Sequence, residues 1–249
     1  MSKKPKSLLM KRIIDVCMTI SLLFVMAFQV TGEVLHEWTG IAMSLLVLVH
    51  QILNRKWYGA FFKGKYNLYR IMTTGVNILL LLSFVLTALS GMAMSGHVVP
   101  FLYGMIKVYY SRIIHISMSH WTFVLMGMHL GLHIPVIATK WNKTGRRMIV
   151  LSSVFCIIAG IGFFLFLRNG MPDYMFLNAV FASFDYNKSV VLVFFENVTI
   201  LLFWVFIGTQ LYRLCRKGSG NNNRNNLQLP IVFIIASVAI GAILNMVKT

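Results

Sequence analysis

The sequence predicts an all-α integral membrane protein, and three observations support this fold class. The chain has 249 residues, of which 58% are apolar and 12% are charged, and its mean hydropathy is +0.76. A soluble globular domain of this size does not need so much apolar surface. The apolar residues gather in runs long enough to cross a bilayer as helices, and most basic residues lie between those runs.

Seven apolar runs are predicted to be membrane spans. The first follows a basic stretch, as in a secretion signal, but it is too long and no small-residue cleavage site follows Phe28, so we expect an uncleaved span. In chain order, the spans cover residues 13–31, 38–53, 71–94, 113–138, 148–167, 190–214 and 229–247.

The connections between the spans differ in character. Residues 54–70 alternate aromatic side chains with lysines, which is typical of a segment lying on the inner membrane surface. Residues 95–110 are expected to form a partly buried outer cap. We expect an interfacial amphipathic segment at residues 172–186 and a polar linker at residues 218–226.

The basic residues predict the topology of the chain. The formal net charge is +17, but the charges lie between spans and not on an exposed domain, which argues against a nucleic-acid partner. With a cytoplasmic N-terminus, eighteen of the 23 basic residues fall on the inner side. The positive-inside rule therefore predicts a multi-pass protein of the cell (cytoplasmic) membrane, with its N-terminus cytoplasmic and its C-terminus extracytoplasmic.

Paired histidines are the main candidate functional residues. His36 and His50 are fourteen positions apart, and so are His115 and His129. In a helix, fourteen steps return a side chain to within about 40° of its starting direction and move it about 21 Å along the axis. Each helix thus offers two imidazoles on one face, at two depths.

The second and fourth spans are parallel in an alternating topology, so equal spacings bring the histidines to matching levels. His36 and His115 would then ligate one haem iron, and His50 and His129 a second one. Neutral imidazole is a suitable axial ligand, and two imidazoles per iron favour electron transfer. The three cysteines include no Cys-x-x-Cys-His motif, so both haems are expected to be non-covalent haem b.

The other histidines fit this arrangement less well. His133 lies eighteen positions from His115, five turns along the same face, and is the alternative to His129. His120 is half a turn out of phase with His129 and is expected to be a hydrogen-bonded histidine pointing away from that haem. His97 lies in the outer cap, where we expect it to be solvated or to pair with a propionate. A purely structural histidine, bonded to a backbone carbonyl, is the alternative for each of the seven.

Several motifs resemble the flavinylation-associated cytochromes, a family of membrane proteins formerly described as a domain of unknown function. The match covers roughly residues 10–140. It rests on Thr31-Gly32-Glu33-Val34-Leu35-His36-Glu37, on His50 with Leu53-Asn54-Arg55-Lys56-Trp57, on Ser90-Gly91-Met92, and on His115, Trp121 and His129-Leu130-Gly131-Leu132-His133. The resemblance implies a four-helix di-haem cytochrome b module that works beside a flavin-carrying protein, with His36, His50, His115 and His129 as ligands.

The sequence therefore predicts a four-helix di-haem bundle over residues 10–140 and three further transmembrane helices over residues 141–249. The expected function is transmembrane electron transfer through two haem b groups, between the quinone pool and a flavinylated extracytoplasmic partner. Quinone is a further candidate ligand, and the chain is expected to be an electron-transfer subunit of an oxidoreductase system. Two alternatives stay open: a quinol dehydrogenase or ferric reductase membrane subunit, and a haem-free transporter or receptor.

Overall fold

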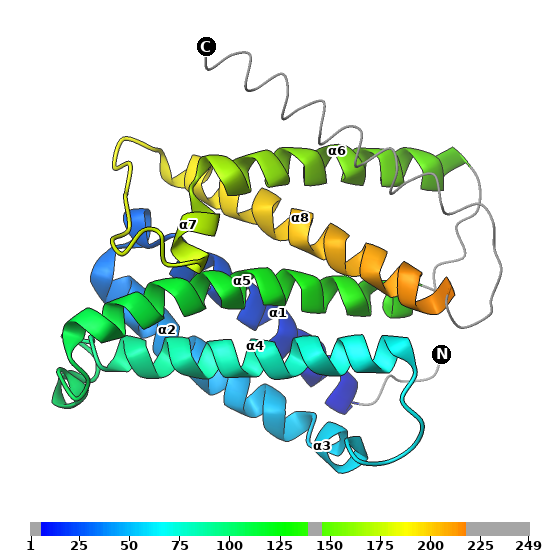
Figure 1. The fold of residues 1–249 in the computed structure, drawn as a ribbon, viewed down its shortest axis with the longest axis horizontal. Helices are drawn as coiled ribbons and strands as arrows, with labels where there is room; N and C mark the ends of the chain where they lie inside the picture. Colours follow the sequence, from blue (N-terminus) through cyan, green and yellow to red (C-terminus); the bar gives the residue numbers. More distant parts are fainter. Residues whose placement is uncertain (1–5, 139–145, 218–249) are drawn as a thin grey trace. The chain divides into compact units, whose positions relative to one another are not determined.

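The computed structural model describes residues 6–138 and 146–217, and within them the regular structure is helical, without strands. Figure 1 labels the helices. Their bounds are α1 (Lys6–Met26), α2 (Phe28–Leu53), α3 (Lys56–Ala60), α4 (Leu68–Met92), the 3₁₀ turn η1 (Pro100–Leu102), α5 (Val108–Ala138), α6 (Arg146–Arg168), α7 (Met171–Met175) and α8 (Val190–Lys217).

Four helices in the described part of the chain are long and apolar enough to cross a membrane. They are Phe28–Leu53, Leu68–Met92, Leu151–Arg168 and Val190–Arg216. The predicted spans at residues 13–31 and 113–138 correspond to α1, which contains Lys11, Arg12 and Asp15, and to α5, which contains four histidines and three serines. The predicted span at residues 229–247 and the linker at residues 218–226 lie outside the described residues, so the count of seven stays a prediction.

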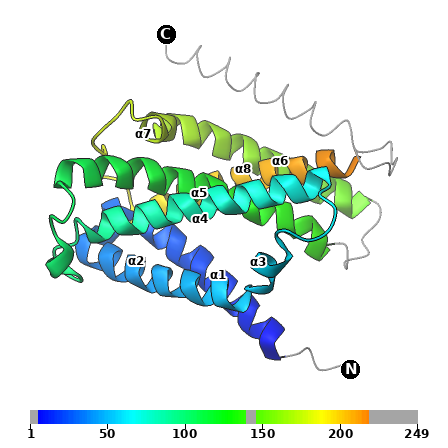
Figure 2. The same cartoon turned by 60° about the horizontal axis from the view of Figure 1, so that its bottom comes forward.

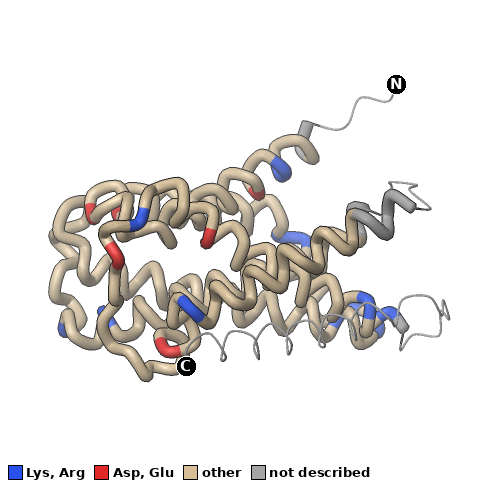
Figure 3. Tube along the Cα trace, turned by 90° about the horizontal axis from the view of Figure 1, so that it is seen from above, with Lys and Arg blue, Asp and Glu red and all other residues tan. Residues whose placement is uncertain are grey.

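The charged residues lie mostly near helix ends and in the connections, with long uncharged stretches between them (Figure 3). Many large apolar side chains within the helices are exposed on the protein surface, among them Leu45, Leu48, Leu79 and Leu82. Exposed apolar faces of this extent are expected where a helix meets lipid. The architecture is that of an all-α protein with membrane-spanning character.

The chain forms two compact units, and α4, α5 and α8 each contribute to both. The first unit consists of Met1–Lys65, Val85–His115 and Phe181–Asn197, and the second of Tyr66–Phe84, Ile116–Val180 and Val198–Thr249. The predicted division near residue 140 stays a prediction.

In the first unit, α1 and α2 pack side by side (Figures 1 and 2). The chain reverses direction between them at residues 27–32, where Gly32 has a φ of +72°. Glycine adopts this left-handed conformation without steric cost, which explains its position in the turn. At the opposite end of the pair, the Lys11 ammonium donates a hydrogen bond to Asn54 Oδ1 at 2.9 Å. The two helices are therefore antiparallel and in a defined register.

Small residues allow close helix packing in the second unit. A Cβ atom on Gly131 would overlap the Val205 carbonyl oxygen, and one on Gly208 would overlap the Met128 carbonyl oxygen. The Thr209 hydroxyl also lies within hydrogen-bonding distance of the Gly131 carbonyl oxygen, at 3.3 Å. Backbones that approach this closely are typical of membrane helix pairs. These contacts join α5 to α8 and account for Gly131 as a packing residue.

The predicted interfacial segment at residues 172–186 contains the short helix α7 followed by irregular structure. Its Met175 carbonyl oxygen accepts hydrogen bonds from Ser117 Oγ at 2.9 Å and from Trp121 Nε1 at 3.1 Å. Two side chains of α5 therefore fix α7 in place, while Phe176 is 63% exposed. An anchored segment that presents an exposed aromatic ring is consistent with the interfacial prediction.

Candidate haem-ligating histidines

All four predicted ligands form a hydrogen bond through Nδ1. His36 donates to the Val25 carbonyl oxygen at 3.0 Å and His115 to the Thr87 carbonyl oxygen at 2.9 Å. The other two bond to side chains: His50 donates to Asp15 Oδ1 and His129 to Asn77 Oδ1, both at 2.8 Å. A hydrogen on Nδ1 leaves the lone pair of a neutral imidazole on Nε2. This tautomer is the one in which Nε2 can bind a metal.

His36 and His115 are brought together in the first unit. Their ring centroids are 5.9 Å apart and their ring planes are inclined by 75°. A metal–imidazole bond is about 2.0 Å long, so two rings bound on opposite sides of one metal have centroids about 6 Å apart. The separation of this pair fits a shared metal, and it also lies in the range of about 4.5–7 Å for edge-to-face ring pairs.

Gly91 leaves space for the His115 ring. A Cβ atom at this position would lie 2.9 Å from Cε1 and 3.1 Å from Nδ1 of His115. Any larger residue would push the ring out of its present orientation, in which Nδ1 donates to Thr87. The glycine of the Ser90-Gly91-Met92 motif is thus explained by close contact with a predicted ligand.

His50 has a second polar neighbour at its other ring nitrogen. Asn54 Nδ2 lies 3.3 Å from His50 Nε2 and donates to the His50 carbonyl oxygen at 2.9 Å. An amide N–H directed at Nε2 needs a lone pair there, which agrees with the hydrogen on Nδ1 that Asp15 accepts. Both contacts therefore indicate the same tautomer for His50, and in this structure its Nε2 lone pair faces the Asn54 amide.

His129 and His133 lie one turn apart on α5, and their ring centroids are 4.6 Å apart. The alternative ligand is therefore a direct neighbour of the predicted one, as their spacing in a helix requires. His129 also has the Nδ1 bond to Asn77 within the second unit. That bond orients the His129 ring.

His120 and His97, which are not predicted to be ligands, have surroundings that differ from those of the four predicted ligands. His120 Nδ1 donates to the carbonyl oxygen of Ile116 in its own helix at 2.7 Å, and its ring lies 5.0 Å from that of Tyr174. This agrees with the expectation of a hydrogen-bonded histidine between helices. His97 has a side chain that is 47% exposed and lies 3.8 Å from Glu33, measured from Nε2 to Oε2. Its exposure agrees with the first of the two expectations, a solvated histidine, and pairing with a propionate stays a prediction.

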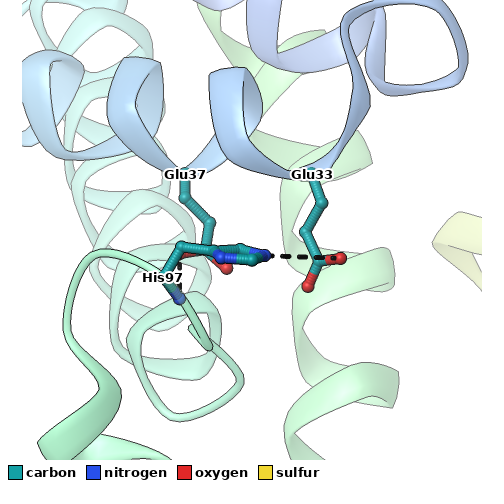
Figure 4. Close-up of side chains that lie close together, drawn as sticks. All are labelled: Glu33, Glu37 and His97. Carbon is teal, nitrogen blue, oxygen red and sulfur yellow. Dashed lines mark hydrogen bonds and ion pairs between the residues drawn. The ribbon is translucent and has the colours of Figure 1, made fainter.

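Glu33 and Glu37 of α2 form a cluster with His97 of the loop that follows α4 (Figure 4). Their ligand-type atoms lie within 4.8 Å of one another. The Glu37 carboxylate, however, accepts hydrogen bonds from Ser95 Oγ and from the backbone N–H groups of residues 96, 97 and 98. Glu37 therefore anchors the loop to α2, and this role alone explains why the three side chains lie together.

Sequence reasoning missed Asp15 and Asn77, the side chains that accept hydrogen bonds from His50 and His129. The helical period identifies residues on the same face of one helix, but not their partners on other helices. The sequence does contain a signal for one of them, because an ionisable residue within an apolar span is rare and indicates a functional role. Asp15 is such a residue in the predicted first span.

No protein-family model, no curated protein and no solved structure matches this chain. The resemblance to the flavinylation-associated cytochromes therefore rests on the sequence motifs given above.

Proposed function

We propose that this protein is a membrane cytochrome b that transfers electrons across the bilayer through two non-covalent haem groups. The observation that supports the proposal most directly is the His36–His115 pair, with its centroid separation of 5.9 Å. Both rings have Nδ1 bonded to a backbone carbonyl oxygen. Structural histidines can form the same bonds and can pack edge to face at this distance, so the support comes from the separation together with the matched fourteen-residue spacings.

The chain's own residues would hold and orient the cofactors. The Val25 and Thr87 carbonyl oxygens orient the rings of His36 and His115, and Gly91 provides room for the latter. His50 and His129, which we propose as the second ligand pair, are oriented by Asp15 and Asn77. Haem, when bound, supplies the one-electron iron couple, and the protein supplies ligands, a low-dielectric surrounding and spacing.

The charges of the first unit support the proposed sidedness. The contact between Lys11 and Asn54 places the start of α1 beside the end of α2, where Arg55 and Lys56 follow. Glu33 and Glu37 lie at the other end of α2. The basic end would face the cytoplasm under the positive-inside rule. We propose electron flow between the quinone pool and a flavin-carrying protein outside.

A reduced-minus-oxidised optical spectrum of the purified protein tests whether haem is present. The proposal predicts b-type absorption bands, whereas a haem-free transporter or receptor gives none. Reconstitution into liposomes with a quinol then tests the electron path: the haem bands should become reduced without sustained turnover, until a flavin-carrying acceptor is added. Rapid quinol oxidation with a small soluble acceptor or ferric chelate alone would instead indicate a quinol dehydrogenase or ferric reductase.

A further inference from the structure

Three arginines lie where the start of α4 meets the end of α8 in the second unit (Figures 1 and 2). The rings of Tyr69 in α4 and Tyr212 in α8 have centroids 5.2 Å apart. Arg70 and Arg213 directly follow these tyrosines in the sequence, and Arg216 Nη1 donates to the Tyr212 hydroxyl at 2.9 Å. The tyrosine contact therefore brings three arginines to one end of this unit.

The acidic residue of this unit lies elsewhere. In the sequence of the second unit, Asp173 of α7 is the one acidic side chain. The Met175 carbonyl oxygen joins α7 to Trp121 of α5, whereas the Tyr69 hydroxyl lies 3.4 Å from the Leu132 carbonyl oxygen of the same helix. Trp121 and Leu132 are eleven positions apart, which is about 16 Å along a helix. Within the second unit, the charge of the arginines is thus not compensated by a nearby carboxylate.

The arginines lie at the ends of two helices that are long and apolar enough to cross a membrane, since one candidate span begins in α4 and another ends in α8 at this level. Arg70 and Arg213 are half-buried. The residues that follow them, Ile71 and Leu214, are 53% and 54% exposed. Exposed apolar side chains next to tyrosines and arginines are typical of the boundary between hydrocarbon and headgroups. A phospholipid at this boundary meets apolar side chains with its acyl chains and arginines with its phosphate.

We propose that the arginine cluster, Arg70, Arg213 and Arg216, binds the phosphate of an anionic phospholipid. A guanidinium presents a planar fork of N–H groups that matches two phosphate oxygens. Basic sites between transmembrane helices are suited to such headgroups, and the positive-inside rule places this one in the cytoplasmic leaflet. The inference goes beyond the proposed function and does not depend on haem. The lipid would be a structural ligand that stabilises the contact between α4 and α8.

The Tm of the purified full chain in an uncharged detergent, measured against added lipid, tests this site. Phosphatidylglycerol should raise the Tm to a plateau, whereas phosphatidylcholine with the same acyl chains and inorganic phosphate should not. In the Arg213→Gln/Arg216→Gln variant, the half-maximal phosphatidylglycerol concentration should rise roughly tenfold or more, because charge-assisted hydrogen bonds are lost. Arg12→Gln/Arg55→Gln removes two exposed arginines of the first unit and is the matched control, which should respond as the wild type does.

An equal Tm response to phosphatidylcholine, or an equal loss of the phosphatidylglycerol response in the control variant, would show that the lipid effect does not arise at the arginine cluster. An equal response to inorganic phosphate would show that a free anion is bound and not a lipid. If the double variant does not fold, Arg216→Gln is measured in its place, since Arg216 is exposed. A weaker response to phosphatidylglycerol in Arg216→Gln supports the site, and an unchanged response contradicts it. These outcomes leave the proposed electron transfer unaffected.

Discussion

At the scale of single residues, the orientation of the histidine rings depends on hydrogen bonds at Nδ1, which leave Nε2 as the proposed metal-binding atom. His36 and His115 use the carbonyl oxygens of Val25 and Thr87 for this purpose. A ring fixed in this way presents Nε2 in one direction and in one tautomer. Preorganisation of this kind reduces the loss of side-chain freedom when a cofactor binds.

Gly91→Ala tests the contact between α4 and the His115 ring. The added methyl group would lie 2.9 Å from Cε1 of His115, so the ring must rotate and lose its bond to Thr87. We expect the purified variant to lose about half of its haem, because one of the two sites is disrupted.

Gly59→Ala is the matched control for this substitution, since a Cβ atom at Gly59 meets no atom within 4 Å. It should keep the full haem content. If the Gly91→Ala variant binds as much haem as the wild type, the orientation of the His115 ring is unimportant for haem binding.

The ligand candidates could be predicted from the sequence, but their hydrogen-bond partners could not. The spacing of His36 and His50 depends only on the helical period, which is a local property. Asp15 lies 35 positions before His50, and Asn77 lies 52 positions before His129. Such contacts depend on how helices pack and on their register, and neither follows from one sequence pattern.

At the scale of helices, close packing in the second unit depends on glycines that face neighbouring backbone. Besides the contact of Gly208 with α5, a Cβ atom at Gly162 of α6 would overlap the Thr199 carbonyl oxygen of α8. Gly131 of α5 likewise faces backbone, since a Cβ atom there would overlap the Val205 carbonyl oxygen of α8. By contrast, Gly32 belongs to the turn before the main part of α2 and not to a packing surface.

Gly208→Ala should separate α5 from α8. Its methyl group would overlap the Met128 carbonyl oxygen and approach Gly131 Cα to 3.0 Å. Overpacking of this kind costs about 1–3 kcal/mol, so we expect a clearly lower Tm in detergent, measured by differential scanning fluorimetry. An unchanged Tm in this variant, alongside an unchanged Tm in Gly59→Ala, would mean that the two helices are not in close contact.

At the scale of the whole molecule, composition and charge predicted an all-α membrane protein, and the described residues agree with this class. The helices found in the structure follow the predicted apolar runs because length and hydropathy are properties of each segment alone. The number of spans depends on more than this, since α1 contains the charged residues Lys11, Arg12 and Asp15 and α5 contains four histidines. Their membrane insertion would depend on helices that cover those residues.

The most direct test of the central claim is the number of haems bound per chain, measured by the pyridine haemochrome assay on purified protein. We predict two haems in the wild type and in His120→Ala, whose histidine donates through Nδ1 to the Ile116 carbonyl oxygen of its own helix. His50→Ala and His115→Ala should each retain one haem, since each removes a ligand of a different site. A wild-type chain without haem, or His50→Ala and His115→Ala chains that both keep two, would contradict the account.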